Sequence, residues 1–210
     1  MQIAVLGMGR FGSALARALA VQGHEVLAID LHDIEVQRIA PDVSKAAIAD
    51  ITDEQALRGL NVHEMDVAVV ATAVLDASVL ATMNLQALEV PLIYAKASSD
   101  RHATILRRVG AQRVVEPEKE GGERFAHLIR VAGATDYLSL TPQYGIGLYS
   151  PPGRLAGRPV ETVASDDTTR RLLMIVRGDE VKLNPALNEI VEAEDILVFA
   201  GADEDLAKDL

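Results

Sequence analysis

The sequence contains no cysteine. This absence excludes disulfide bonds, thiolate nucleophiles and cysteine-ligated metals, and it is compatible with a reducing compartment. Long apolar runs are also missing, because the longest, around residues 67–75, is far shorter than a membrane-spanning helix of roughly 18 residues. The N-terminus lacks the basic segment and apolar segment of a secretory signal. We therefore expect a cytoplasmic protein that does not itself cross the membrane.

Basic charge is scarce relative to acidic charge. Lys and Arg total 20 against 31 Asp and Glu, which leaves a net charge of -11. A nucleic-acid-binding face needs clustered Lys and Arg, so nucleic acid is not expected as a partner. The five histidines are scattered without metal-binding spacing, and no histidine metal site is predicted. Any anionic ligand must be held by a few local groups.

The most informative stretch is residues 2–12, a short apolar run that ends in glycines and opens into an Ala- and Leu-rich segment. This order predicts a strand, a tight turn and a helix. Gly7 permits the turn, Gly9 permits close approach to a phosphate, and Gly12 lets the helix lie against the strand. The predicted phosphate site at the helix N-terminus also includes the intervening residues Met8, Arg10 and Phe11.

Two charged residues refine this prediction. Asp30 ends the next predicted strand 18 positions after Gly12, close to the roughly 20 expected for an acid that binds an adenosine ribose. Its alternative role is to cap the following helix. Arg10 is unusual in a dinucleotide-binding loop, and its guanidinium suits a terminal phosphate. A solvated position in the first helical turn is the alternative.

Six predicted strands alternate with helices along residues 2–115. This alternation predicts an α/β fold, a Rossmann-like doubly wound parallel sheet with strand order 3-2-1-4-5-6. Ligands of such sheets bind beyond the carboxyl ends of the strands. Further candidates at those ends are Leu31, Asp50, Ile51, Thr52, Ala71, Thr72 and Lys96. Helix capping is the alternative for Asp50, Thr52 and Thr72, and a surface position is the alternative for Lys96.

The pattern changes near residue 118. We predict a first domain over residues 1–134, including an amphipathic crossover helix at about 119–132. Residues 133–159 are rich in Gly and Pro and are interpreted as a connector or hinge. A smaller α+β domain completes residues 135–210, with strands at 171–177, 181–184 and 195–200 and a hairpin turn at Gly178-Asp179. Its core is thin, so we expect it to pack on a second copy.

Signals for catalysis are weak. None of the four tyrosines has a Lys four positions later, as a short-chain reductase requires, and the Gly-Lys-Ser/Thr ending of a P-loop is absent. We therefore expect no enzyme activity. A small NAD-dependent oxidoreductase remains the alternative, in which Asp30 favours NAD over NADP. A nucleotide sensor with a different effector is a third possibility.

Four motifs together resemble one family: Val-Leu-Gly-Met-Gly-Arg-Phe-Gly, Gly-His-Glu-Val-Leu-Ala-Ile-Asp, Val-Gly-Ala-Gln-Arg-Val-Val-Glu-Pro-Glu-Lys-Glu and Leu-Asn-Pro-Ala. They are similar to the regulator of potassium conductance (RCK) subunits of the Ktr and Trk potassium uptake systems. The resemblance implies a cytosolic gating subunit. It also implies homodimers assembled into an octameric ring beneath a potassium-translocating membrane subunit.

The resemblance implies ligands as well. The crevice would bind ATP or ADP, or NAD(H) in Trk-like members, with Arg10 on terminal phosphates, Asp30 on the ribose and residues 50–52 beside the adenine. Glu118 matches a position that binds a divalent cation, Mg or Ca, near the phosphates. The crossover helix would swap onto a partner. Some members bind cyclic di-AMP in the C-terminal half, but Asp166 and Asp167 stand where those members carry Arg, which disfavours that ligand.

Overall fold

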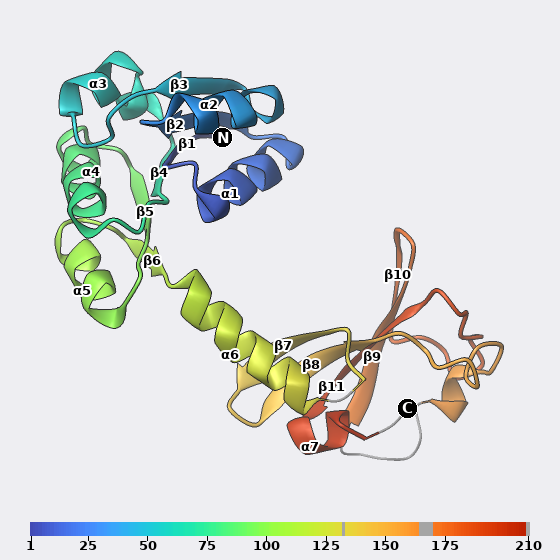
Figure 1. Cartoon of the computed structure of the whole chain (residues 1–210). Coiled ribbons are helices and arrows are strands. Elements are labelled where there is room, and N and C mark those ends of the chain that lie inside the picture. The colour runs from blue at the N-terminus through green and yellow to red at the C-terminus, as the bar shows by residue number, and fades with distance from the viewer. Residues whose placement is uncertain (132, 164–169, 209–210) are drawn as a thin grey trace. The chain divides into compact units, whose positions relative to one another are not determined.

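The computed structural model describes residues 1–131, 133–163 and 170–208. The chain divides into two compact units, Met1–Glu118 and Lys119–Leu210, and each has its own sheet (Figure 1). None of the described helices combines the length and apolar character that a membrane crossing requires. Asp166 and Asp167, which bear on the cyclic di-AMP prediction, lie outside the described residues.

The N-terminal unit contains a parallel sheet of six strands in the order β3-β2-β1-β4-β5-β6. This order confirms the predicted fold class. Because β1 lies in the middle and pairs with both β2 and β4, its carboxyl end is surrounded by the ends of its neighbours. The strands are β1 Gln2–Leu6, β2 Glu25–Asp30, β3 Lys45–Ile48, β4 Val67–Val70, β5 Leu92–Lys96 and β6 Arg113–Val115.

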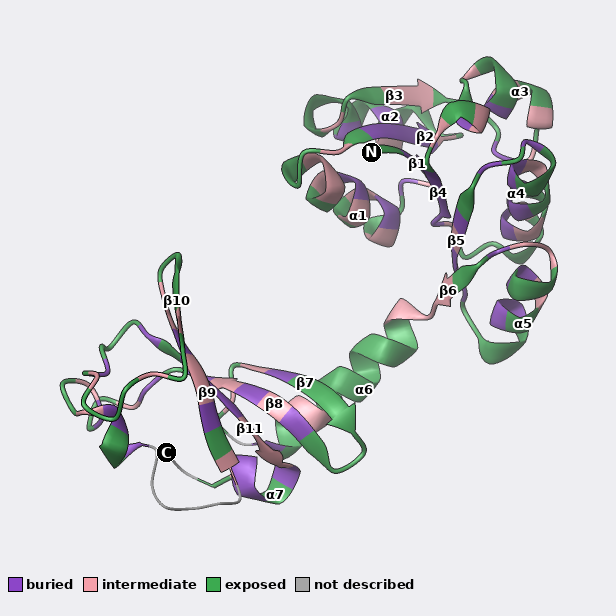
Figure 2. Cartoon of the chain, turned by 180° about the vertical axis from the view of Figure 1, so that it is seen from behind, coloured by how far each residue is buried: buried purple, intermediate pink, exposed green. Residues whose placement is uncertain are grey.

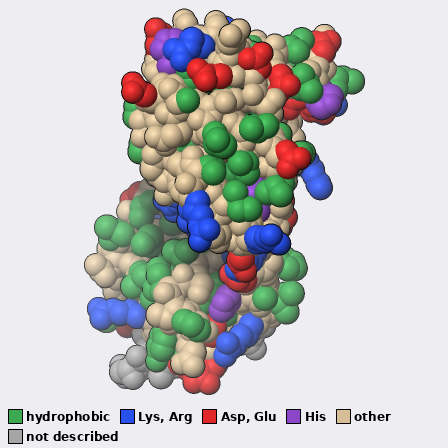
Figure 3. Space-filling view, turned by 90° about the vertical axis from the view of Figure 1, so that its left-hand side faces the viewer, with side chains coloured by type: hydrophobic (Ala, Val, Ile, Leu, Met, Phe, Trp, Pro, Cys, Tyr) green, Lys and Arg blue, Asp and Glu red, His purple; other side chains and the backbone are tan. Residues whose placement is uncertain are grey.

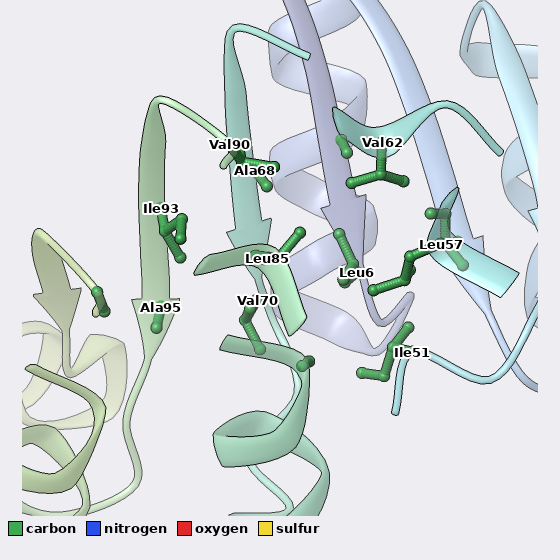
Figure 4. Packing of buried hydrophobic residues seen from close by; sticks show 14 of the residues in the cluster. Leu6, Ile51, Leu57, Val62, Ala68, Val70, Leu85, Val90, Ile93 and Ala95 are labelled. Carbon is green, nitrogen blue, oxygen red and sulfur yellow. The ribbon is translucent and has the colours of Figure 1, made fainter. Parts of the chain in front are cut away.

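Helices cover both faces of this sheet. Helices α1 (Arg10–Val21) and α2 (Asp33–Ile39) pack on one face, and α3 (Glu54–Gly59), α4 (Leu75–Ala87) and α5 (Asp100–Arg108) pack on the other. Figure 4 shows Leu6 and Val70 of the sheet beside Leu57 of α3 and Leu85 of α4. Alternate side chains of β1 and β4 enter opposite apolar layers, and the sequences of these strands are therefore continuous apolar runs. Short 3-10 turns occupy Ala40–Asp42, Val62–Glu64 and Val160–Thr162.

Helix α6 (Pro117–Arg130) begins two residues before the start expected for the crossover helix, at about 119. Its C-terminal half packs on the second unit, where the His127 ring stacks 5.2 Å from the Tyr137 ring and Arg130 lies 3.3 Å from the buried Asp203 carboxylate. Figure 2 shows that the helix is otherwise exposed, and Phe125 and Ile129 retain 62% and 70% of their accessible surface. The two compact units meet at Glu118, within the first turn of this helix, so that most of α6 belongs to the second unit.

The second unit contains an antiparallel sheet of five strands in the order β10-β9-β11-β8-β7. The strands are β7 Asp136–Thr141, β8 Tyr144–Tyr149, β9 Arg170–Arg177, β10 Glu180–Leu183 and β11 Ile196–Ala202, and the short helix α7 Asp203–Leu206 follows. The hairpin turn at Gly178-Asp179 is confirmed, because Arg177 pairs with Glu180. The interpretation of residues 133–159 as a connector is wrong for residues 136–149, which form β7 and β8.

The glycines of β8 led to the wrong connector interpretation. They make room for two tyrosine rings and do not make the chain flexible. A Cβ on Gly145 would lie 2.1 Å from the Tyr137 hydroxyl, and one on Gly147 would lie 2.7 Å from the Tyr149 ring. Tyr137 cannot easily move, since its hydroxyl donates a 2.5 Å hydrogen bond to buried Asp203. Burial, reinforced by this carboxylate, raises the pKa of Tyr137. Burial likewise raises the pKa of Tyr149 to about 12.

Replacing Gly145 with alanine is expected to destabilise the second unit by about 1–3 kcal/mol. The new methyl would overlap the Tyr137 ring, whose hydroxyl is fixed by its hydrogen bond to Asp203. Hydrogen exchange of β7 and β8 peptides in the intact chain measures the change. Gly153→Ala is the matched control, since a Cβ there meets no atom within 4 Å. Equal exchange rates in the two variants would contradict the packing role of Gly145.

Candidate functional site

The turn between β1 and α1 brings the backbone of two elements unusually close. Gly7 has a φ of +100°, a conformation that favours glycine, and its N–H donates to the Ile29 carbonyl at 2.7 Å. A Cβ on Gly12 would lie 1.9 Å from the Gly7 carbonyl oxygen, so only glycine allows α1 to start here. A Cβ on Gly9 meets no atom within 4 Å, and this residue faces open space.

The N-terminus of α1 is suited to an anion. Gly9 is the N-cap and has no side chain to accept hydrogen bonds from the first-turn N–H groups. The first turn carries no acidic residue and begins with Arg10. The partial positive charge of the helix end and the Arg10 guanidinium therefore point to one region of space beside Gly9.

Asp30 fixes the glycine turn to the end of β2. Its Oδ2 accepts a hydrogen bond from the Met8 N–H at 2.6 Å, and its Oδ1 accepts one from the His32 N–H at 2.8 Å. Burial would raise the pKa of Asp30, but these backbone hydrogen bonds and the nearby His32 ring outweigh it and lower the pKa below its usual value. Asp30 does not cap α2, whose N-cap is His32. Oδ1 also contacts the His32 ring Nδ1 at 3.0 Å, so it is Oδ2 that retains a lone pair for a ligand hydroxyl.

Lys96 and Glu118 form an ion pair that lines the same cleft as the glycine turn. The Lys96 ammonium donates to Glu118 Oε1 at 2.6 Å and lies 5.7 Å from the centre of the Phe11 ring. Lys96 is only 8% exposed, whereas the Glu118 side chain is 70% exposed. The hydrogen bond from Lys96, with a smaller contribution from the charge of Arg10, lowers the pKa of Glu118.

These groups line a cleft of about 630 Å³ at the carboxyl ends of the strands. A smaller pocket of about 210 Å³ shares three of its residues, Gly7, Asp30 and Thr72, and continues toward the end of β3. The large cleft is lined by Gly7, Gly9, Arg10, Phe11, Asp30, Ala71, Thr72, Ala73, Lys96, Pro117 and Glu118. The small pocket adds Leu31, His32, Ala49, Asp50, Ile51, Val74 and Ala77.

The structure brings most of the predicted site residues to these two hollows. Three line neither: Met8 is buried, Gly12 packs against Gly7, and the Thr52 hydroxyl is hydrogen-bonded to Asp50. Sequence reasoning missed Ala73, Pro117, His32, Ala49, Val74 and Ala77. All but Ala77 lie within two positions of a predicted residue, so extending each predicted strand end by that length would have found them. Ala77 lies five positions after Thr72, inside α4, and only the folded structure brings it to the pocket.

The polar residues after β3 and β4 form local turns. Asp50 Oδ1 accepts hydrogen bonds from the Thr52 hydroxyl at 2.7 Å and the Thr52 N–H at 2.8 Å, and these bonds lower the pKa of Asp50. The cap of α3 is instead Asp53, which accepts from the Gln55 N–H at 2.8 Å. Thr72 accepts from the Val74 N–H at 3.3 Å. Capping by Asp50 and Thr52, the alternative considered from the sequence, does not occur.

Within the described parts of the chain, no three His, Asp or Glu side chains gather as a metal site. Glu118, the predicted cation ligand, pairs with Lys96. The residues present therefore supply one carboxylate to a divalent cation beside a bound phosphate, and the other ligands must come from the phosphate, water or another chain.

Comparison with known proteins assigns the family. The family model described as the TrkA-N domain matches residues 3–117, which contain the whole parallel sheet and both hollows. The chain belongs to the TrkA-N family. This TrkA-N protein is 34% identical over 212 residues to Ktr system potassium uptake protein C of Bacillus subtilis (strain 168), covering 99% of this chain and 95% of the relative.

A second Ktr protein and two solved structures agree with this assignment. Ktr system potassium uptake protein A of the same organism is 32% identical over 214 residues, covering 99% of this chain and 94% of that protein. The crystal structure of the GsuK RCK domain matches with a TM-score of 0.66 and 19% identity, and it covers 98% of this chain and 46% of that chain. The TrkA-N protein thus has the RCK fold, and the resemblance to RCK subunits of Ktr systems is confirmed.

The GsuK channel bound to NAD matches with a TM-score of 0.63 and 17% identity, covering 99% of this chain and 39% of that chain. The TrkA-N protein therefore spans less than half of the GsuK chains, whereas it spans nearly all of the Ktr proteins. At this level of identity the GsuK structures establish only the fold of this chain. The ligand of the cleft must be inferred from the chemistry of the residues that line it.

Replacing Asp30 with asparagine tests its role in holding the glycine turn. Asparagine offers one oxygen to two backbone N–H donors, so we expect a loss of about 1–3 kcal/mol of local stability. Faster hydrogen exchange of the peptide covering residues 7–12 would report it. Asp33→Asn on the exposed first turn of α2 is the matched control and should leave this peptide unchanged. An unchanged turn in Asp30→Asn would show that Asp30 does not anchor it.

Proposed function

We propose that this chain is a nucleotide-sensing regulatory subunit of a potassium uptake system and that the cleft beside Gly9 holds an adenine nucleotide. The proposal rests on one observation above the others. A chain that aligns over 99% of its length with Ktr potassium uptake proteins presents an uncapped helix N-terminus, Arg10 and Lys96 around a single cleft of about 630 Å³. That volume suits a small-molecule ligand.

The two hollows suggest how the nucleotide lies. Its phosphates are placed over the N-terminus of α1, within reach of Arg10 and Lys96. Its ribose faces Asp30, the acidic residue between the hollows, and its adenine enters the smaller, mainly apolar pocket beside Ile51. GsuK has been solved bound to ADP, and that structure matches this chain with a TM-score of 0.52. ATP and ADP are the proposed ligands, with NAD(H) as the alternative and Mg or Ca beside Glu118.

Regulation requires the competing ligands to differ in what they contact. A ligand shifts a conformational equilibrium only by its difference in affinity for the two states. ATP differs from ADP by the γ-phosphate, and Arg10 is an exposed cation that lines the cleft. We therefore assign to Arg10 the discrimination between ATP and ADP, and we propose no enzymatic turnover.

Exposed apolar surface supports assembly with further copies. Figure 3 shows hydrophobic side chains gathered on the face of the N-terminal unit that carries α4. On this helix Leu75, Leu80 and Met83 are each about half exposed, at 47%, 47% and 50%. Phe125 and Ile129 of α6 add a second such surface. Patches of this kind on soluble proteins mark interaction sites.

The second unit exposes an apolar sheet face as well. Tyr137, Phe199 and Ile175 enter its core, so the alternating residues of the same strands point to the opposite face. The strand register aligns apolar residues across that face, including Leu148, Val198, Met174 and Leu183 in one row. Leu138, Val181 and Leu183 on this face are more than half exposed. These surfaces support a homodimer that assembles into a homo-octameric ring.

The proposed partner is the potassium-translocating membrane subunit of the same uptake system, which would hold this chain at the cytoplasmic face of the membrane. The names of the Ktr relatives support a role in potassium uptake. The proposed role is to transmit a change of ring conformation to that subunit when the bound nucleotide changes.

Nucleotide binding in the cleft is tested by calorimetry with ATP, ADP, NAD and NADH. ATP and ADP are expected to bind the wild-type chain. Gly9→Ala should weaken both at least tenfold while the fold is retained, because Gly9 lines the cleft and a Cβ there touches no protein atom. Gly59→Ala, also unobstructed but within α3, is the matched control and should bind like wild type.

Two outcomes would contradict the proposal. Failure of every adenine nucleotide to bind would exclude the sensor. Turnover of NADH with a carbonyl substrate, together with a monomeric mass near 22.5 kDa by light scattering, would instead support the oxidoreductase alternative.

A further inference from the structure

The pair formed by Lys96 and Glu118 differs from an ordinary surface ion pair. Its cation is almost fully buried, at 8% exposure, while its anion is a mostly exposed side chain. A buried ammonium needs a partner, because leaving it unpaired in a low-dielectric setting is costly. Lys96 therefore requires an anion at this position, whereas Glu118 could exchange its partner for water at little cost.

The location of the Lys96–Glu118 pair connects it to ligand binding. Lys96 and Glu118 both line the large cleft, together with Gly9 and Arg10. A carboxylate and a phosphate are the same kind of acceptor for an ammonium, since each offers charged oxygens at hydrogen-bond distance. The Glu118 carboxylate thus occupies the Lys96 bond that a phosphate of the proposed nucleotide would take.

We propose that Glu118 is a built-in competitor for phosphate at Lys96, which makes tight binding of a nucleotide conditional on a divalent cation. Without a cation, an entering phosphate must break the Lys96–Glu118 bond and then meets the Glu118 charge at close range. With a cation, Glu118 gains a new positive partner and its repulsion of the phosphate is removed. This inference rests on the proposed nucleotide site and adds that the site favours a nucleotide accompanied by a divalent cation.

The same exchange couples the cleft to the helix that follows. Glu118 lies in the first turn of α6 and is the last residue of the N-terminal unit. Its bond to Lys96 ties that turn to the end of β5. When a phosphate takes Lys96, the turn loses this tie, so the occupancy of the cleft is communicated to the start of α6 by a change of one ion pair.

The inference and a simple cation-ligand role for Glu118 predict different results when a chelator removes divalent cations. If Glu118 only binds a cation, Glu118→Gln changes binding in the absence of a divalent cation no more than the loss of one negative charge nearby does. If Glu118 competes with phosphate for Lys96, Glu118→Gln must strengthen nucleotide binding in the chelator, because the neutral amide no longer holds the Lys96 ammonium. The size of the gain, compared with that from the loss of one nearby charge, decides between them.

The experiment is calorimetric titration of the full chain with ATP in EDTA and then in Mg²⁺. In EDTA, Glu118→Gln is expected to bind ATP roughly tenfold more tightly than wild type. In Mg²⁺ this gain should disappear or reverse. Lys96→Met should weaken ATP in both buffers, since it removes the cation and keeps the apolar stem. Glu123→Gln on α6 is the matched control for the change of one charge and should stay within twofold of wild type.

The outcomes separate this inference from the proposed function. Equal or weaker ATP binding by Glu118→Gln in EDTA, with wild type binding normally in Mg²⁺, overturns the competitor role and leaves the nucleotide site standing. Absence of ATP binding by wild type and by Glu118→Gln in both buffers overturns the nucleotide site itself. A thermal melt of each variant shows that the fold is retained.

Discussion

The close approach of α1 to the end of β1 is the constraint on which the candidate site depends. With a Cβ only 1.9 Å from the Gly7 carbonyl oxygen, position 12 admits nothing but glycine, and the helix N-terminus can then point into the cleft. Asp30 holds the turn through the Met8 N–H, so the second strand determines where the first helix begins. The ends of β4 and β5 complete the cleft because they are neighbours of β1 and β4 in the sheet order.

Electrostatics within the cleft differ from those of the whole chain. A protein with a net charge of -11 repels anions at long range, so an anionic ligand gains its affinity from a few groups at contact distance. Arg10, Lys96 and the α1 N-terminus supply that attraction, while Asp30 and Glu118 oppose it. This near balance makes the affinity sensitive to one added phosphate or one added cation, as a sensor requires.

Much of the N-terminal unit could be predicted from sequence because its signals are local and periodic. Apolar runs, glycines and strand-end acids follow one another in a regular order, and the right-handed crossover then restricts the topology. The second unit was harder to predict. Glycines in β8 were interpreted as breakers, because their value in accommodating Tyr137 and Tyr149 depends on contacts between strands. The packing of α6 within the second unit likewise depends on tertiary contacts of His127 and Leu128.

The candidate site likewise combines features that local sequence signals predict with features that depend on tertiary contacts. Individual residues at the strand ends could be predicted, but their partners could not. Lys96 and Glu118 are 22 positions apart, and nothing in the local sequence indicates that a buried ammonium and an exposed carboxylate meet. Asp30 was predicted to contact a ribose, and its hydrogen bonds to Met8 and His32 add a structural role that no spacing rule reveals.

The most direct test of nucleotide-dependent regulation is potassium flux into liposomes that contain the membrane partner together with this chain. The account predicts different fluxes in saturating ATP and saturating ADP for the wild-type chain, and the same flux in both nucleotides for Arg10→Ala. Equal fluxes for wild type, or an undiminished difference in Arg10→Ala, would contradict it.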